Sequence, residues 1–204
     1  MLYPDVFAQI VRTDEGHTRR TYVNPTVQLR VSTRTTPSLG VNYSRNEDNT
    51  QFFGNFTDAA GVTHYTFAHL DQTTIGLTFR VDCTASPTLT LQVYANPFVS
   101  KGTYSDVREA AHPRAARYDD RFVPYANAAV AANPVAFNFK AFNSSTVLRW
   151  EYRPGSSLYL VWTQGRQDFE PLEGSRALSG DLDRLFRVHP ADTFLVKVAH
   201  WFDW

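Results

Sequence analysis

Hydrophobic and polar residues alternate with a period of two along most of the chain, a pattern typical of β-strands with one apolar face. In the fourth such run the apolar positions are Ile75, Leu77, Phe79 and Val81. The runs predict eight strands, at residues 4–13, 18–34, 38–56, 62–83, 88–99, 136–153, 157–168 and 193–204. We therefore expect an all-β fold in which consecutive strands pair antiparallel.

The last run carries the most information about the environment of the protein. One face of it holds only apolar or aromatic residues and one histidine: Phe194, Val196, Val198, His200, Phe202 and Trp204. About 9 to 11 tilted residues take a β-strand across a bilayer, and aromatic rings prefer the membrane interface. The run therefore predicts the closing strand of an outer-membrane β-barrel, with these six residues as its insertion signal. A soluble sandwich ending on an alternating strand is the alternative.

The connections between the predicted strands differ in length. Every second connection is short and contains proline, at residues 35–37, 84–87 and 154–156. Two of the others are long, at residues 100–135 and 169–192. Outer-membrane barrels have short periplasmic turns and long extracellular loops. The predicted fold is therefore an antiparallel up-and-down transmembrane barrel within a single domain, 1–204, and it places both long loops outside the cell. The pattern fits eight strands that close alone or a segment of a larger barrel.

Charged residues occupy the faces opposite the apolar ones. We expect them to line a lumen, where charges of opposite sign can pair across strands. The predicted lining consists of Arg30, Arg80, Asp82, Arg149, Glu151, Arg153 and Lys197. In a soluble, lipocalin-like barrel the same charges would face bulk water and the apolar faces would turn inward, so this second fold stays open.

Composition restricts the function further. The chain has 204 residues with 20 basic and 20 acidic side chains, a balance that argues against nucleic-acid binding. A single cysteine, Cys83, excludes an internal disulfide. No run of 18 apolar residues predicts a transmembrane helix, and the first residues do not form a signal peptide. Since an outer-membrane barrel must be exported, we expect an export signal upstream and a chain that is the C-terminal piece of a longer protein.

No catalytic constellation stands out. Glu151 and Asp82 could be proposed as a glycosidase pair, but both have basic neighbours at strand spacing. His69 and Asp71 share a strand face without a third ligand at metal spacing. Hydrolase and phosphate-loop motifs are absent from the sequence. We expect no catalytic residue, metal or cofactor in this chain.

The first long loop contains aromatic residues beside arginines and aspartates, a mixture suited to stacking on sugars or to folding into a lumen. Loops of this length are commonly functional or disordered. Its candidate ligand contacts are Tyr104, Tyr118, Phe122 and Tyr125. Ligand contact and closure of the pore remain equal alternatives.

The segment LRWEYRPGSSLYLVWTQGR at residues 148–166, followed by FLVKV at 194–198, resembles the C-terminal end of a bacterial family of unknown function. Further matching stretches are residues 70–74, 94–98 and 117–122. Members of that family usually carry a carbohydrate-binding family 9-like module upstream and are often labelled as hydrolases. The resemblance implies an outer-membrane barrel behind a sugar-binding domain. That module is absent here, so the resemblance assigns sugar binding to no residue of this chain.

These observations together predict a membrane anchor or pore in the outer membrane of a Gram-negative-type bacterium. Its expected partners are outer-membrane lipid and the barrel-assembly machinery, with a glycan or another polar solute as the molecule captured or passed. The alternatives are a barrel that tethers a carbohydrate-active hydrolase domain and a soluble lipocalin-like binder.

Overall fold

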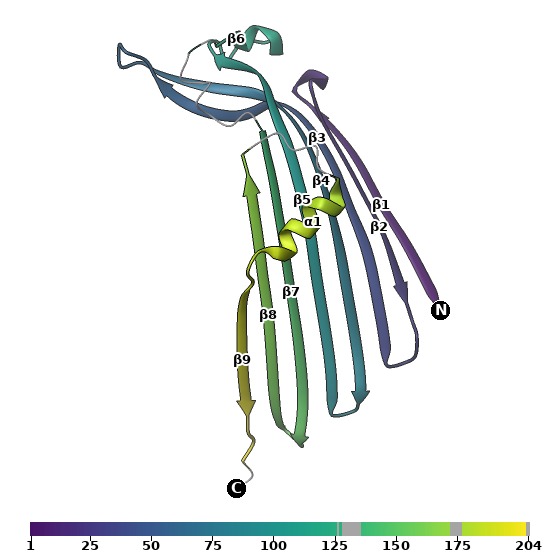
Figure 1. The fold of residues 1–204 in the computed structure, drawn as a ribbon. Coiled ribbons are helices and arrows are strands. Elements are labelled where there is room, and N and C mark those ends of the chain that lie inside the picture. Colours follow the sequence, from purple (N-terminus) through teal and green to yellow (C-terminus); the bar gives the residue numbers. More distant parts are fainter. Residues whose placement is uncertain (126, 128–135, 172–176, 203–204) are drawn as a thin grey trace.

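Strands that follow one another in the sequence lie side by side in one antiparallel sheet (Figure 1). The computed structural model describes residues 1–125, 127, 136–171 and 177–202. Eight strands form the sheet, and the short β6 (Phe122–Pro124) pairs with β5. In order they are β1 (Leu2–Thr13), β2 (Thr18–Leu29), β3 (Thr35–Thr57), β4 (Thr63–Ser86), β5 (Leu89–Ala110), β7 (Ala136–Arg153), β8 (Ser156–Glu170) and β9 (Ala191–Ala199).

Each of the eight predicted strands is present, so the all-β, up-and-down antiparallel fold is confirmed. The main difference is in β5, which continues to Ala110 through residues 100–110 of the predicted loop at 100–135. These residues lack clear alternation because Asp106 has a positive φ of 50° and the pairing with β4 shifts between Phe67 and His69. In addition, β2 ends at Leu29 and β9 at Ala199, both earlier than predicted.

The short connections β2–β3, β4–β5 and β7–β8 lie at one end of the sheet, together with the start of β1 and the end of β9 (Figure 1). This agrees with the predicted alternation of short and long connections. Pro37 is the one correction, because it lies inside β3 and the preceding turn is formed by residues 30–34. Gly155 closes the β7–β8 turn with φ of 75°, a conformation that glycine adopts without strain. We call this end of the sheet the short-turn end and the opposite one the loop end.

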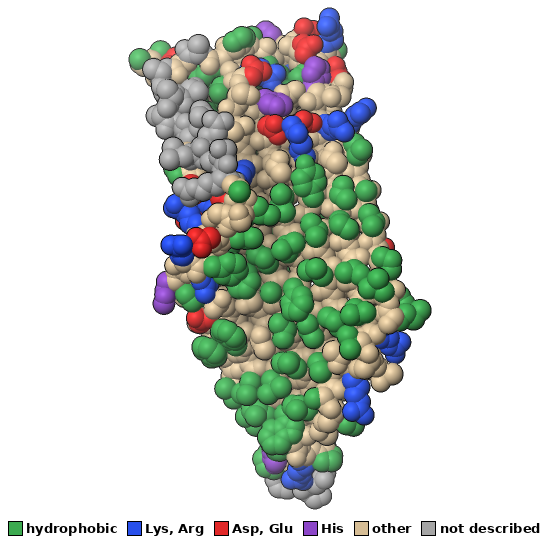
Figure 2. All heavy atoms as spheres, turned by 45° about the vertical axis from the view of Figure 1, so that its right-hand side comes forward, with side chains coloured by type: hydrophobic (Ala, Val, Ile, Leu, Met, Phe, Trp, Pro, Cys, Tyr) green, Lys and Arg blue, Asp and Glu red, His purple; other side chains and the backbone are tan. Residues whose placement is uncertain are grey.

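The sheet has one apolar and one polar face, because paired residues share a face and the register shifts only toward the strand ends. On β4 and β5, for example, Ile75 lies opposite Val99 and Phe79 opposite Ala95. Figure 2 shows hydrophobic side chains spread over most of the apolar face. Many of them are open to solvent, among them Phe194, which is 74% exposed, and Val6, which is 67% exposed. We call this set of side chains the apolar belt.

Helix α1 (Leu178–Arg187) lies across β5, β7 and β8 on the apolar face, within the loop predicted at 169–192. Its residue Leu178 borders a pocket with Ile75 and Val99. Leu185 is fully buried, whereas Arg187 points outward. The helix therefore covers only the part of the apolar face nearest the loop end. No helix in the described parts of the chain is both long and apolar enough to cross a membrane.

The outermost strands leave the sheet open. β1 pairs only with β2, and β9 pairs only with β8, among the described residues. All residues of both strands are exposed. The closed barrel of eight strands is therefore not observed, and β1 and β9 both present backbone groups that could pair with further strands.

Candidate functional site

A ladder of polar side chains crosses the polar face between β2 and β5. Asn24 donates its amide Nδ2 to Oδ1 of Asn42 at 2.6 Å, and Asn42 donates to the hydroxyl of Thr78 at 3.2 Å. From the other side, Asn96 donates to the same hydroxyl at 3.2 Å. These amides satisfy one another without charge, and none of them is among the residues predicted to line a lumen.

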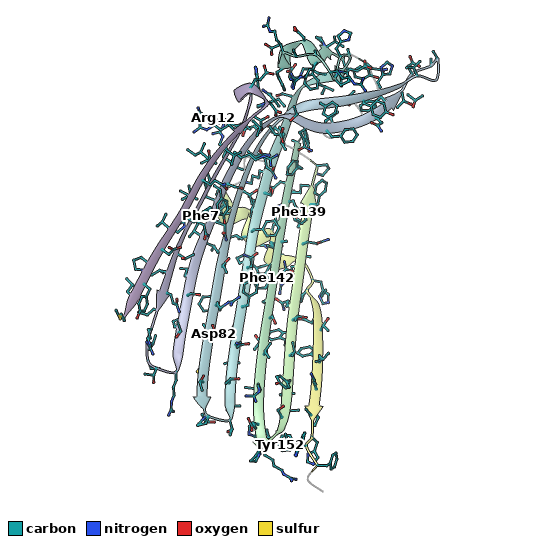
Figure 3. All side chains as sticks on the ribbon, turned by 180° about the vertical axis from the view of Figure 1, so that it is seen from behind. Phe7, Arg12, Asp82, Phe139, Phe142 and Tyr152 are labelled. Atoms are coloured by element: carbon teal, nitrogen blue, oxygen red, sulfur yellow. The ribbon has the colours of Figure 1, made fainter. Side chains whose placement is uncertain are left out.

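Five of the seven predicted lumen-lining charges lie on the polar face in two groups, both nearer the short-turn end. In the first group, Asp82 (Figure 3) accepts a hydrogen bond from Gln92 at 3.1 Å. The guanidinium of Arg80 lies 5.7 Å from the ring centre of Tyr94. These side chains border a shallow cavity of about 160 Å³ that is also lined by Ser145 and Val147.

The second group surrounds Tyr159. Arg149 forms an ion pair with Glu151 at 3.2 Å and donates to the hydroxyl of Tyr159 at 3.2 Å. The ammonium group of Lys197 lies 5.7 Å from the same ring. Arg149 and Glu151 lie on the same strand, β7, so this ion pair is not the predicted pairing of charges across strands. Arg30 and Arg153 lie apart from both groups, exposed at the short-turn end.

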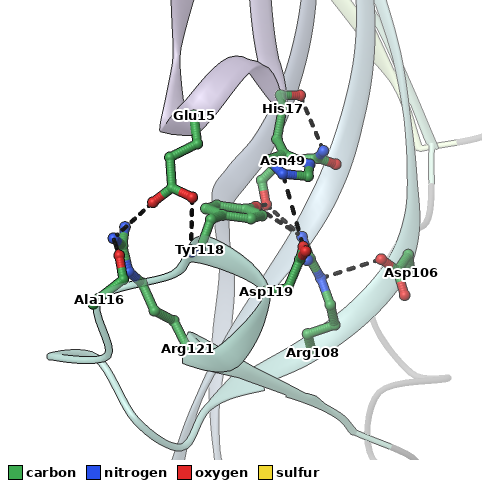
Figure 4. Close-up of polar contacts among 9 residues, drawn as sticks. All are labelled: Glu15, His17, Asn49, Asp106, Arg108, Ala116, Tyr118, Asp119 and Arg121. Atoms are coloured by element: carbon green, nitrogen blue, oxygen red, sulfur yellow. Dashed lines mark hydrogen bonds and ion pairs between the residues drawn. The ribbon is translucent and has the colours of Figure 1, made fainter.

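At the loop end, a buried tyrosine joins three distant parts of the chain (Figure 4). Tyr118, which is 1% exposed, donates its backbone N–H to Glu15 at 3.1 Å and its hydroxyl to the carbonyl of Asn49 at 3.0 Å. Arg108 donates to the same carbonyl at 2.6 Å, and Arg121 forms an ion pair with Glu15 at 3.2 Å. We call this set the loop-end cluster. It fixes residues of the first long connection, after the end of β5, on the tip of the β1–β2 hairpin.

The four predicted ligand contacts all pack against other rings of the chain. Tyr118 stacks on His17 with ring centres 4.3 Å apart, and Phe122 lies 5.7 Å from Phe67. Tyr125 stacks on Phe56 at 5.9 Å. Tyr104 belongs to β5, where it contacts Phe53 and Phe137, and not to a loop. Burial leaves Tyr118 unavailable for stacking on a ligand, while ligand contact by the other three remains a prediction.

The predicted insertion signal is divided between β9 and the residues after it. Phe194, Val196 and Val198 lie on the apolar face, and Phe194 stacks on Trp162 at 5.9 Å. His200 and Phe202 follow the strand, and Nδ1 of His200 is 2.9 Å from the hydroxyl of Tyr152. Trp204 lies outside the described residues.

An ionic cluster beneath α1 was not identified from the sequence. Lys140 is fully buried on the apolar face and contacts Asp168 at 3.1 Å and Glu170 at 2.7 Å. Arg184 of the helix contacts the same two carboxylates, and Asp181 of the helix pairs with Lys101. The cluster balances three cations with three anions. The available signal was the presence of Lys140 and Asp168 at positions where the register requires apolar residues.

A family model described as "Domain of unknown function (DUF5916)" matches residues 1–204. The chain belongs to this family. The description assigns no function to the family, in agreement with the resemblance to a family of unknown function found in the sequence. Neither a curated protein nor a solved structure matches the chain.

The DUF5916 fold holds α1 on the sheet through Lys140, which leads to a prediction for stability. Removal of one partner from a buried ionic group costs about 3–5 kcal/mol, because the remaining charges lose their compensation. We expect Lys140→Met to lower the free energy of unfolding by that amount in denaturant titrations. Arg187→Gln, which breaks an exposed pair with Asp183, should cost less than about 1 kcal/mol. Equal effects of the two substitutions would contradict the role of Lys140.

The pKa of His64, on the β3–β4 hairpin, should lie above the ordinary histidine value of about 6.5. Its Nδ1 lies 2.9 Å from the carboxylate of Glu109 and its Nε2 lies 3.5 Å from that of Asp58. The bond to Glu109 is the main cause that raises the pKa of His64. Protonated His64 therefore stabilises the hairpin. This stabilisation is fully present when the pH is below the pKa of His64 in the unfolded chain, and it is lost as the pH rises through the pKa in the folded chain. An NMR titration should show the raised pKa, and Glu109→Gln should lower it; an unchanged value in the variant would refute the contact.

Proposed function

We propose that this chain is a wall segment of an outer-membrane β-barrel that serves as a membrane anchor or as a pore for polar solutes. In this proposal the apolar face contacts lipid and the polar face contacts water in the interior. The observation that carries it is the apolar belt, which extends over all eight long strands and remains exposed outside the area of α1. Soluble monomers rarely expose an apolar surface that extends beyond a few hundred Å².

The belt has a suitable height. On β4 it extends from Ile75 to Cys83, and on β1 from Leu2 to Ile10. Each stretch measures about 26 Å along the strand at about 3.3 Å per residue, or about 20 Å along the membrane normal for a tilt of about 40°. Transmembrane barrels have an outward apolar band about 25 Å tall, so side chains that project beyond the end residues bring the belt close to this size.

The belt is also staggered as tilted strands require. Its middle residue is Phe79 on β4 and Val196 on β9. The row of paired residues that contains Val196 runs through Leu160, Leu148 and Leu91 to Cys83. Cys83 lies four residues from Phe79, and four strand-to-strand steps separate β4 from β9. The middle of the belt thus shifts by one residue for each strand-to-strand step. A strand tilt of about 35–45° requires a shift of about 1.0–1.4 residues per step, so the observed stagger fits the lower end of this range.

The polar face would supply the wall of the interior. It carries the amide ladder, the Arg80 and Arg149 groups and the cavity beside Arg80. Hydroxyl, amide and charged groups of this kind bind water and polar solutes. They favour passage or capture of a polar solute, of which a glycan is one class.

The open edges define what this segment needs. Within the hydrocarbon region an unpaired strand edge cannot satisfy its backbone groups with water. We therefore place further strands beside β1 and β9 and a larger barrel around this segment, with insertion by the barrel-assembly machinery.

Refolding tests the proposal. The chain, or the longer protein that contains it, should fold in detergent micelles or liposomes into a form that resists protease and migrates differently on gels with and without boiling. Leu160→Arg places a charge at the middle of the belt and should lower stability by about 2–4 kcal/mol in liposomes. Thr163→Arg, on the polar face of the same strand, should cost far less. Folding only in buffer without detergent or lipid would refute the proposal.

A further inference from the structure

Basic residues mark the boundary of the apolar belt on its loop-end side. Six of the eight long strands carry one on the apolar face, at or just beyond the last belt residues of the strand. We call this set the basic girdle, and it consists of Arg12, Arg19, Arg45, Lys101, Lys140 and Arg166.

The stagger of the sheet places the two ends of the girdle at one height. The row of paired residues that starts at Gln164 on β8 reaches Pro4 on β1. Arg166 lies two residues nearer the loop end than Gln164 and therefore in the same ladder row as Val6. Arg12 lies six residues nearer the loop end than Val6. Six strand-to-strand steps separate β1 from β8. At one residue per step, Arg12 and Arg166 lie at the same distance from the membrane centre.

Four members of the girdle have partners within the chain: three are paired with carboxylates, and the fourth donates to backbone carbonyls. Arg45 contacts Glu47 at 3.0 Å and Asp71 at 3.1 Å. Lys101 and Lys140 belong to the ionic cluster beneath α1, and Arg166 donates to the carbonyls of Phe186 and Val188 at the end of the helix.

Arg12 and Arg19 differ from the other four. They lie directly opposite each other on β1 and β2, both are exposed, and Arg12 is seen at the loop end of its strand in Figure 3. Within the described residues neither guanidinium lies at ion-pairing distance from a carboxylate, and Glu47, opposite Arg19, is paired with Arg45. Like charges directly opposite each other destabilise a sheet. An external anion between the two arginines would remove this repulsion.

We propose that Arg12 and Arg19 bind the phosphate of a lipid headgroup in the leaflet at the loop end. This inference rests on the proposed function, because the pair is adjacent to lipid only if the apolar belt spans the membrane. Arginine is suited to the role, since its planar guanidinium donates two parallel hydrogen bonds to phosphate oxygens. Ile10, next on the same face, would contact the acyl chains below the headgroup.

The test measures the affinity of dihexanoyl phosphatidic acid for the full chain folded in dodecyl maltoside micelles. Each basic residue near a membrane surface contributes about a fivefold factor to the binding of anionic lipid. We expect Arg12→Gln and Arg19→Gln each to weaken binding about fivefold and the double variant about 25-fold. Arg34→Gln removes an exposed arginine at the short-turn end and should leave the affinity unchanged.

Two comparisons fix the identity of the ligand. Dihexanoyl phosphatidylcholine should bind more weakly than phosphatidic acid, and inorganic phosphate should compete only weakly. Unchanged affinity of the double variant for phosphatidic acid would overturn the inference. Inorganic phosphate that binds as tightly as the lipid would also overturn it. Neither result would contradict the barrel proposal. Failure to fold in micelles, both of the wild-type chain and of a longer protein that supplies strands beside β1 and β9, would instead contradict the proposed function, and the inference with it.

Discussion

The register of the antiparallel ladder is the constraint on which the other features depend. Because side chains alternate between faces, a slip of one residue between two strands would move a whole row of apolar side chains to the polar face. The pairs Leu39 with Phe79 and Leu160 with Val196 show the register that keeps the belt continuous. The same register brings Asn24, Asn42 and Asn96 into one ladder on the other face.

The stagger connects features that are distant in the sequence. It explains why β7 and β8 carry Lys140, Asp168 and Arg166 on the apolar face near the loop end. The same ladder rows on β1 to β4 carry apolar residues. In the proposed membrane orientation these charges lie above the lipid, in the position where α1 covers them. The helix and the girdle therefore follow from one geometric property of the sheet.

Much of this fold could be predicted from alternation, because alternation reports directly on which environment each face meets. The stretch from Ser100 to Ala110 escaped prediction because Gly102 and the irregular backbone at Asp106 break the pattern within a strand that β4 supports by pairing. Helix α1 escaped it because ten residues with Asp181 and Arg184 on the inner side look polar in sequence. Their partners Lys101, Lys140 and Asp168 are brought together only by pairing between strands distant in the sequence. For the same reason the placement of Tyr118 beneath the β1–β2 hairpin could not be foreseen.

The most direct test of the account is a scan of lipid contact along β4. Single cysteines at positions 74 to 82, in a Cys83→Ser background, would be labelled with a small fluorophore and quenched by brominated lipids in liposomes. The account predicts strong quenching at Ile75, Leu77, Phe79 and Val81 and weak quenching at the positions between them. Uniformly weak quenching, or strong quenching at Thr74, Gly76, Thr78 and Arg80, would contradict the assignment of the apolar face to lipid.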